Sequence, residues 1–311
     1  MINDEKRSGA YYTGGSLRLV DEPLRTPLEN TVSAHKRREW RVRHAQDMSQ
    51  FACHHCAILS DGSFAVFAKY GEGPDAREQF EIELAGLHYL SENASVLIPA
   101  PIAIVAAGNG AMFILEAVRP VERGSLQWRQ IGRTLARIHQ VTSDTCGFPT
   151  NGFVGPLYQD NTPTRDWATF YAERRLWPRL STAINSGNLP SPVASQVERL
   201  IHRLPELCGP NRTQSLLHGD AQQNNFISTE RGPVVIDPAV YYGDPEIDMA
   251  LVDAWEPVPD DVFASYSEEM PLDAGFRERR GLWRVALYLA AVAIEGPMHL
   301  CRLRDALRMY V

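Results

Sequence analysis

Three polar residues in the carboxyl-terminal half of the chain have the types and the spacing that phosphoryl transfer requires. Asp220 follows a His-Gly pair, Asn225 comes five residues later, and Asp237 stands at the end of a short apolar run. In kinases one carboxylate lies beside the attacking hydroxyl, while an amide and a second carboxylate hold magnesium on the phosphates of ATP. The pattern therefore predicts Asp220 as a catalytic base and Asn225 and Asp237 as magnesium ligands.

A hairpin is expected to bring the two predicted magnesium ligands together. Residues 226–228 and 234–236 are largely apolar, and the segment between them contains the turn-forming pair Gly232-Pro233. Two antiparallel strands joined in this way return the chain to its starting point, which places Asn225 beside Asp237. Each polar residue alone also fits a helix cap or a turn. The whole set favours catalysis, because protein kinases have this order of catalytic and metal-binding residues.

Length and composition indicate a globular protein of two lobes or domains. The chain has 311 residues, of which 44% are hydrophobic and 22% charged. Its formal net charge of -7 argues against a nucleic-acid or anionic-membrane partner, because both require a positive surface. We expect the short basic run at residues 36–38 to be a solvated helix face.

Several features predict a cytoplasmic protein that has no membrane partner. No apolar run approaches the roughly 18 residues of a membrane span, and the first residues lack the apolar core of a signal peptide. Five cysteines fit reduced thiols. The segment Cys53-His54-His55-Cys56 is a candidate metal site, but zinc would require a second ligand pair at a recognisable spacing. An ordinary strand or loop is the favoured interpretation there.

The amino-terminal part is expected to contain an extension and then a small lobe. Residues 1–30 are rich in Gly, Pro and polar residues without a clear period, and we expect them to be loosely held. Ser33 is the expected cap of a short helix that runs through Arg37. Residues 31–118 are assigned to a nucleotide-binding N-lobe.

A hairpin and a helix in this lobe carry a candidate ion pair. The patterns predict strands over 51–59 and 63–70, with Lys69 on the second, and a helix over 77–91, with Glu83 off its apolar face. In kinases a strand lysine contacts the ATP phosphates and a helix glutamate orients it. Read alone, each residue also fits an ordinary exposed side chain.

A second hairpin and a helical region complete the chain. The runs 102–105 and 112–115 flank a Gly-Asn-Gly turn and lead to Glu116 and Val118, a predicted hinge whose backbone groups would receive adenine. Residues 119–311 are assigned to a catalytic and substrate-binding C-lobe. Helical periods in it cover 126–141, 167–184, 193–207 and 281–309.

Longer motifs resemble the fructosamine kinase (ketosamine kinase) family, within the aminoglycoside phosphotransferase and protein kinase-like superfamily. The resemblance runs from about Phe51 to the carboxyl end, and the string 237–244 is specific to this family. The motifs are Cys146–Pro149, Asn151–Gly155, Trp167 and Phe170 with Glu173–Leu176, Leu217–Asn225, Ile236–Asp248, Tyr266, Pro271–Phe276 and Arg279-Arg280.

The resemblance implies a bilobal α+β, protein kinase-like fold with a small antiparallel-sheet N-lobe and a larger, mainly helical C-lobe that bind ATP and Mg²⁺. It also implies a role for each motif residue. Asp220 would be the base, Asn225 and Asp237 would hold Mg²⁺, Lys69 would contact phosphates, Glu83 would orient Lys69, His218 would order the catalytic loop, and Asp248 would accept backbone hydrogen bonds from it.

Two positions depart from the family pattern. The stretch 49–55, which matches the glycine-rich phosphate-covering loop of the family, contains no glycine, so weaker nucleotide binding is expected. Family members commonly carry an aromatic residue two positions after the base aspartate, and this chain has Gln222 there. The contact with the acceptor is therefore expected to differ.

The sequence thus predicts an ATP-dependent kinase that phosphorylates a hydroxyl of a ketosamine or a related small molecule. One alternative is an aminoglycoside-like or other small-molecule kinase with an acidic pocket, for which Asp160, Asp166 and Asp244 are candidates. Another is a catalytically silent nucleotide-binding regulatory module, which the glycine-free loop alone favours. The acceptor and the oligomeric state stay open at this point.

Overall fold

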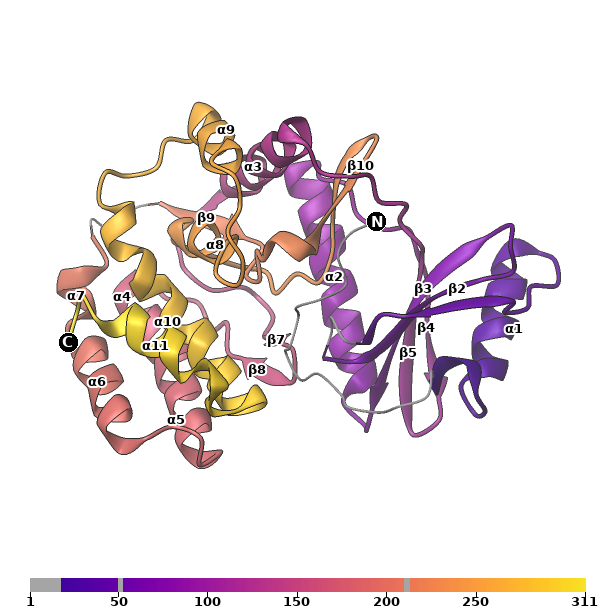
Figure 1. The fold of residues 1–311 in the computed structure, drawn as a ribbon, viewed down its shortest axis with the longest axis horizontal. Helices are drawn as coiled ribbons and strands as arrows, with labels where there is room; N and C mark the ends of the chain where they lie inside the picture. The colour runs from indigo at the N-terminus through magenta and orange to yellow at the C-terminus, as the bar shows by residue number, and fades with distance from the viewer. Residues whose placement is uncertain (1–17, 50–52, 210–212) are drawn as a thin grey trace. The chain divides into compact units, whose positions relative to one another are not determined.

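The computed structural model describes residues 18–49, 53–209 and 213–311. These residues form two compact units (Figure 1). Unit 1 comprises the chain up to Glu81 together with Ala100–Ala117, and unit 2 comprises Ile82–Pro99 together with Val118–Val311. Helix α2 (Ala76–Ala94) crosses the boundary. The sequence-based boundaries assign this helix to the N-lobe as a whole, whereas most of it belongs to unit 2.

Unit 1 contains a five-stranded antiparallel sheet. The order of the strands is β1-β2-β3-β5-β4, with bounds β1 His44–Asp47, β2 His55–Ser60, β3 Ala65–Glu72, β4 Pro101–Ala107 and β5 Gly110–Glu116. The two predicted hairpins are confirmed as β2–β3 and β4–β5. Gly62 and Gly108 have positive φ in their turns, a conformation that costs glycine little. The predicted start of the first strand, Phe51, lies outside the described residues.

Helix α1 (Arg25–Lys36) lies against the sheet beside β4 (Figure 1). The prediction of a loosely held extension is wrong for residues 18–30, because Leu19, Leu24 and Leu28 are buried in the hydrophobic core of unit 1. The cap predicted at Ser33 is also wrong. Ser33 lies inside α1, and its hydroxyl accepts a 3.0 Å hydrogen bond from the N–H of Trp40, which holds the turn after the helix.

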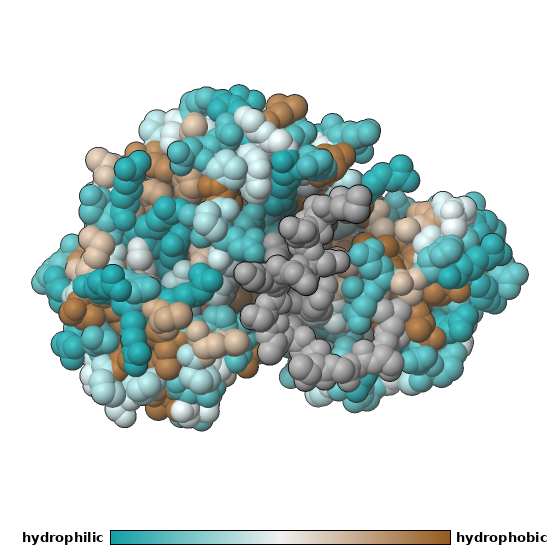
Figure 2. Space-filling model, viewed as in Figure 1, coloured by the Kyte–Doolittle hydropathy of each residue, from teal (hydrophilic) through white to brown (hydrophobic). Residues whose placement is uncertain are grey.

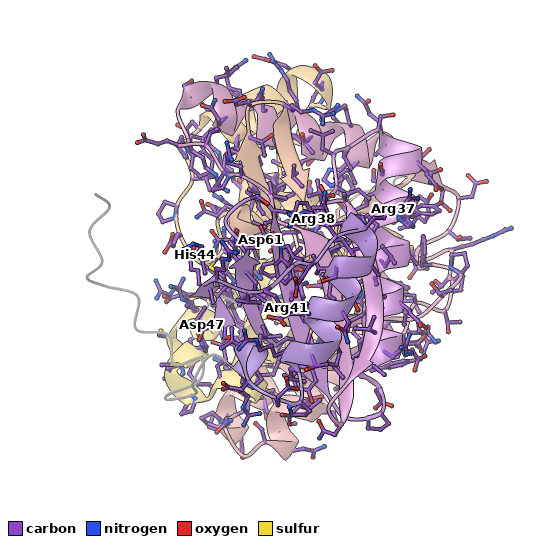
Figure 3. All side chains as sticks on the ribbon, turned by 90° about the vertical axis from the view of Figure 1, so that its right-hand side faces the viewer. Arg37, Arg38, Arg41, His44, Asp47 and Asp61 are labelled. Carbon is purple, nitrogen blue, oxygen red and sulfur yellow. The ribbon has the colours of Figure 1, made fainter. Side chains whose placement is uncertain are left out.

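The basic run after α1 lies at the surface of unit 1. Figure 3 labels Arg37, Arg38 and Arg41 on this face. Arg38 donates to the carboxylate of Asp61 at 2.7 Å, and Arg41 lies 3.2 Å from the carboxylate of Glu39. Within the predicted run 36–38, Arg37 and Arg38 are exposed but follow the end of α1, and Lys36 is half-buried with Nζ 3.9 Å from the centroid of the Phe64 ring. The prediction of a solvated helix face is therefore confirmed for the exposure of the two arginines and is wrong for their place on a helix.

Unit 2 is mainly helical. Helix α3 packs on α9, and α10 packs on α5, α8 and α11, around a core that includes Trp283, Tyr171 and Phe226. The bounds are α3 Ser125–His139, α4 Trp167–Tyr171, α5 Trp177–Asn185, α6 Ser191–His202, α7 Leu204–Leu207, α8 Glu246–Leu251, α9 Asp261–Glu269, α10 Phe276–Glu295 and α11 Leu300–Leu307.

Two predicted helices are interrupted. A π-helical turn, η3 (Ala172–Leu176), separates α4 from α5. The helix predicted over 281–309 breaks at Gly296, which has a φ of 104°, and at Pro297, which cannot donate a helical hydrogen bond. The break produces α10 and α11, which pack on each other.

Short strands join the helices of unit 2. Strand β9 (Gln214–Leu217) is central in a three-stranded sheet, between β12 (Tyr241–Gly243) and β6 (Thr142–Ser143). Strands β10 (Phe226–Thr229) and β11 (Gly232–Val235) form the hairpin predicted from the sequence. A further hairpin pairs β7 (Gly152–Val154) with β8 (Leu157–Gln159).

Within the described ranges, no helix combines the length and the hydrophobicity needed to cross a bilayer. On the face shown in Figure 2, hydrophobic residues are scattered between hydrophilic ones.

Two buried thiols are expected to resist modification. Burial raises the pKa of Cys146 and that of Cys208 to about 12, whereas Cys301 is exposed. Because the thiolate is the nucleophile, we expect iodoacetamide at neutral pH to label Cys301 in the folded protein and to spare Cys146 and Cys208. Peptide mass spectrometry before and after denaturation measures the difference. Equal labelling rates at Cys301 and Cys146 in the folded protein would contradict the burial.

Candidate active site

A buried strand positions the loop that carries Asp220. All four residues of β9 are buried, and the strand ends directly before His218. Gly219 then turns the chain with a φ of 81°. The loop continues into a single 3₁₀ turn, η4 (Gln223–Asn225). Asp220 is half-buried just before this turn.

Both carboxylate oxygens of Asp220 accept a hydrogen bond from the loop itself. The side-chain amide of Gln222 donates to Oδ1 at 2.7 Å, and that of Asn225 donates to Oδ2 at 3.2 Å and to the Asp220 carbonyl at 2.7 Å. Burial raises the pKa of Asp220, and the nearby negative charge of Asp237 raises it further. The hydrogen bonds from Gln222 and Asn225 and the neighbouring His218 act in the opposite direction on this pKa.

The β10–β11 hairpin brings Asp237 back to the loop. Phe226 pairs with Val235, and the N–H of Ile236 donates to the carbonyl of Asn225 at 3.0 Å. Asp237 follows with a φ of 54°, a left-handed conformation that non-glycine residues adopt at some cost. The structure therefore brings Asp220, Asn225 and Asp237 together, in the arrangement that their spacing predicts.

The donor set at this point suits magnesium. The amide nitrogen of Asn225 faces Asp220, and among residues 18–49, 53–209 and 213–311 no group donates to its Oδ1. One amide oxygen and one or two carboxylates are typical of Mg²⁺, which takes its other ligands from phosphates and water. The described part of the chain contains no group of three or more His, Cys, Asp or Glu side chains placed to hold a metal, and this includes Cys53–Cys56.

Asp248 fixes the backbone of the loop from behind. It lies on α8 and is completely buried. Its Oδ2 accepts from the N–H of His218 at 2.6 Å, and its Oδ1 accepts from the N–H of Gly219 at 3.1 Å. His139, the last residue of α3, places Nε2 3.2 Å from the same Oδ2. Sequence reasoning missed His139, because a histidine at the end of an amphipathic helix carries no signal of this contact.

His218 joins the loop to the hairpin. Its Nε2 donates to the carbonyl of Ile236 at 3.0 Å, and its Nδ1 accepts from the N–H of Asp220 at 3.2 Å. Both ring nitrogens are thus engaged with backbone groups. This arrangement suits a structural role for His218, which the resemblance also implies.

Gly219 is expected to tolerate no side chain. A Cβ atom there would lie 2.1 Å from the carbonyl oxygen of Ala239, which follows Asp237 by two residues. We expect Gly219→Ala to lower the free energy of unfolding by at least about 2 kcal/mol, since positive φ and a backbone clash add, and to displace Asp220. Thermal melting and ADP release measure the two effects.

Gly187→Ala is the matched control for this prediction. Gly187 has a φ of 77°, but nothing lies within 4 Å of the point that a Cβ atom would occupy. It therefore carries the cost of the conformation without the clash. Equal losses of stability in the two variants would contradict the close approach of Gly219 to Ala239.

The acids proposed for a polycation pocket have structural partners. Asp160 lies 3.1 Å from Arg174 and accepts from the N–H of Thr162, and Asp166 caps α4 by accepting from the N–H of Thr169. Asp244 is buried and accepts from the N–H of Glu246. These are cap and turn contacts, so the three acids give no support to an aminoglycoside-like pocket.

The two residues that are predicted to contact or orient the nucleotide phosphates, Lys69 and Glu83, lie on different elements. Lys69 is buried on β3, opposite Cys56 of β2 and Phe113 of β5. Glu83 is half-buried on α2, within unit 2. The pairing of Lys69 with Glu83 stays a prediction.

The predicted hinge residues lie at the end of the sheet. Glu116 ends β5, and its N–H donates to the carbonyl of Ala100 at 2.9 Å, so this group is engaged within the sheet. Val118 is half-buried and opens the second segment of unit 2. Their contact with adenine stays a prediction.

Comparison with known proteins identifies the relatives of this chain. The family model described as fructosamine kinase matches residues 25–310. The chain belongs to the fructosamine kinase family. A probable ketoamine kinase from Synechocystis sp. is 28% identical over 250 residues, which cover 79% of this chain and 83% of the relative. The family that the sequence resembles is thus confirmed.

Solved structures show the same fold. A candidate fructosamine-3-kinase from Haemophilus somnus aligns with a TM-score of 0.80 at 21% identity, over 91% of this chain and 97% of that one. An aminoglycoside phosphotransferase in complex with ADP and hygromycin B aligns with a TM-score of 0.58 at 13% identity, over 91% and 99%. The predicted α+β, protein kinase-like fold of this fructosamine kinase family member is confirmed.

Proposed function

We propose that this protein transfers the γ-phosphoryl group of ATP to a hydroxyl of a ketosamine, a sugar-amine adduct, in the cytoplasm. The observation that carries the proposal is the convergence of Asp220, Asn225 and Asp237 in unit 2, together with membership of the fructosamine kinase family. Its partner is a small-molecule or glycated-amine substrate. Nucleic acid and membrane have no part in the proposal.

The residues of the loop divide the chemistry between them. Asp220 accepts the proton of the substrate hydroxyl as the oxygen attacks the γ-phosphorus, the bond from that phosphorus to the β,γ-bridging oxygen breaks, and ADP leaves. Asn225, through Oδ1, and Asp237 would hold Mg²⁺, which neutralises charge on the phosphates. Lys69 would contact the phosphates, Glu83 would orient Lys69, and backbone groups of Glu116 and Val118 would receive adenine.

A panel of acceptors tests the proposal. Ketosamines, free sugars, polyols and aminoglycosides are offered with ATP and magnesium, and ADP release is measured. We expect ketosamines to give the highest kcat/KM. A higher kcat/KM with an aminoglycoside would show that the substrate is not a ketosamine. Binding of ATP without turnover of any acceptor would indicate a catalytically silent nucleotide-binding module.

Gln222 is expected to tune the acidity of the base. Its hydrogen bond to Asp220 favours the ionised carboxylate, so its loss in Gln222→Met raises the pKa of Asp220. Because the base must be ionised to accept a proton, activity is lost on the acid side, and the acid limb of kcat/KM moves to higher pH. The direction of this displacement is the test, since a hydrogen bond to a charged group contributes enough, roughly 1.5–3 kcal/mol, to be resolved in a pH profile.

Gln223→Met is the control for Gln222. The Gln223 side chain contacts Arg123 and the carbonyl of Glu256, so its loss leaves the Asp220 carboxylate untouched. A pH profile of Gln222→Met that superimposes on that of Gln223→Met would refute the tuning role.

A further inference from the structure

Two buried arginines lie one helical turn apart in unit 2, outside the loop of Asp220. Arg175 is on the π-helical turn η3 and is 4% exposed, and Arg179 is on α5 and is 7% exposed. A buried charge is costly unless an opposite charge or several hydrogen bonds compensate it. The hydrogen-bond and ion-pair partners of these two side chains therefore indicate whether their role is structural or ligand-binding.

Arg175 is held by uncharged acceptors. Its guanidinium donates to the carbonyl oxygens of Asp160 and Arg174, at 2.8 and 3.0 Å, and to Oδ1 of Asn161 at 2.7 Å. It also lies over the ring of Tyr241, 4.1 Å from the centroid. Its Nε is buried and has no acceptor within the described residues. These hydrogen bonds fix the position of the guanidinium. None of them is to a carboxylate, and the charge of the nearby Asp160 carboxylate acts on Arg175 without a direct hydrogen bond.

Arg179 has less compensation. Among the described residues, the ionisable groups that act on Arg179 are Arg175 and Tyr241, and neither is a carboxylate. Burial lowers the pKa of Arg179 to about 10, and the charge of Arg175 contributes in the same direction. Two like charges thus lie close together in a largely buried part of unit 2.

A half-buried arginine of the same unit has charged partners. Arg279 donates to Glu246 at 2.8 and 2.6 Å and to Asp273 at 2.6 Å, and hydrogen bonds to these carboxylates raise its pKa. The fold thus supplies two carboxylates to Arg279. Among the residues that the structure describes, it supplies none to Arg179.

We propose that Arg175 and Arg179 form the cationic part of a binding site for an oxyanion group, a carboxylate or a phosphate of a small molecule. Guanidinium groups match the geometry of both oxyanions through paired N–H donors. Arg175 is fixed by its uncharged hydrogen-bond partners and contributes positive electrostatic potential to the site. Arg179 would donate the hydrogen bonds to the ligand. π-Helical turns such as η3 often occur at functional sites. The site is independent of the phosphoryl-transfer residues and goes beyond the proposed function.

Thermal stability in the presence of simple anions tests the site. Wild type and Arg179→Met are melted with increasing sodium phosphate or sodium acetate, against sodium chloride at equal ionic strength. We expect phosphate or acetate to raise the melting temperature of the wild type beyond the chloride control. Arg179→Met should lose this response. It should also melt at a higher temperature than the wild type without added anion, because a neutral side chain of similar length replaces an uncompensated buried charge.

Arg199→Met serves as the matched control, since Arg199 is an exposed arginine on the adjacent helix α6. It should respond to anions as the wild type does. Phosphate and acetate separate the two ligand sources, because acetate presents a carboxylate and no phosphate. Arg179→Gln repeats the test with a polar side chain in case methionine disturbs packing.

Three results would overturn the site. They are the lack of any anion-specific rise in the wild type, an undiminished rise in both Arg179 variants, and destabilisation of both variants without anion. None of these measurements uses ATP or turnover, so the oxyanion site and the proposed kinase activity stand or fall separately.

Discussion

Asp220→Asn is expected to bind Mg²⁺-ATP with nearly the affinity of the wild type and to lose turnover by about 10²–10⁴-fold. Asparagine has almost the shape of aspartate but cannot take the proton of the attacking hydroxyl. The predicted magnesium ligands Asn225 and Asp237 are unchanged in this variant, so nucleotide binding should persist. Calorimetry with Mg²⁺-ATP measures binding, and coupled detection of ADP with a ketosamine acceptor measures turnover.

Asp260→Asn is a suitable control, because Asp260 is an exposed acid before α9 in the same unit. It should behave as the wild type in both assays. If Asp220→Asn turned over at the wild-type rate, Asp220 would not be the base. If it lost nucleotide affinity as well, the carboxylate would instead belong to the metal site.

Asp237→Ala is expected to lose both turnover and the part of nucleotide affinity that depends on magnesium. Loss of a carboxylate ligand removes the charge that offsets the divalent ion, and we expect the affinity for Mg²⁺-ATP to fall by roughly 10–100-fold, as for other disruptions of metal sites. Calorimetry with magnesium and with EDTA separates the metal-dependent part. The wild type should show a large difference between the two conditions, and the variant almost none.

The backbone at this position requires a second variant. Asp237 has a φ of 54°, which alanine adopts with strain but asparagine tolerates. Asp237→Asn therefore keeps the backbone and removes the charge. Loss of magnesium-dependent binding in both variants would assign it to the carboxylate, whereas binding that survived in Asp237→Asn would show that the negative charge of Asp237 is not required.

The arrangement around Asp220 could be predicted from the sequence because it is local. Asp220, Asn225 and Asp237 are separated by one turn and one hairpin, and residue types alone indicate both. The contact of Gln222 with Asp220 was not predicted. A glutamine side chain has several rotamers, and only the folded loop selects the one that reaches the carboxylate.

Long-range features were predicted less well. The role of His139 depends on a contact with Asp248, 109 residues away, which no periodic pattern encodes. The boundary between the units falls inside α2, where the helical period continues without interruption. The buried residues 18–30 were misread because Gly, Pro and polar residues diluted the apolar positions Leu19, Leu24 and Leu28.

The contacts of Asp248 have a consequence for how acceptor preference can diverge. The groups that shape the catalytic loop come from α8 and α3 and are completely buried, whereas Gln222 lies on the partly open side of the loop. Substitutions on the partly open side can therefore accumulate without disturbing the backbone N–H groups that Asp248 holds and that orient the loop of Asp220. Engineering this enzyme toward another acceptor should begin with Gln222 and should leave Asp248 and His139 untouched.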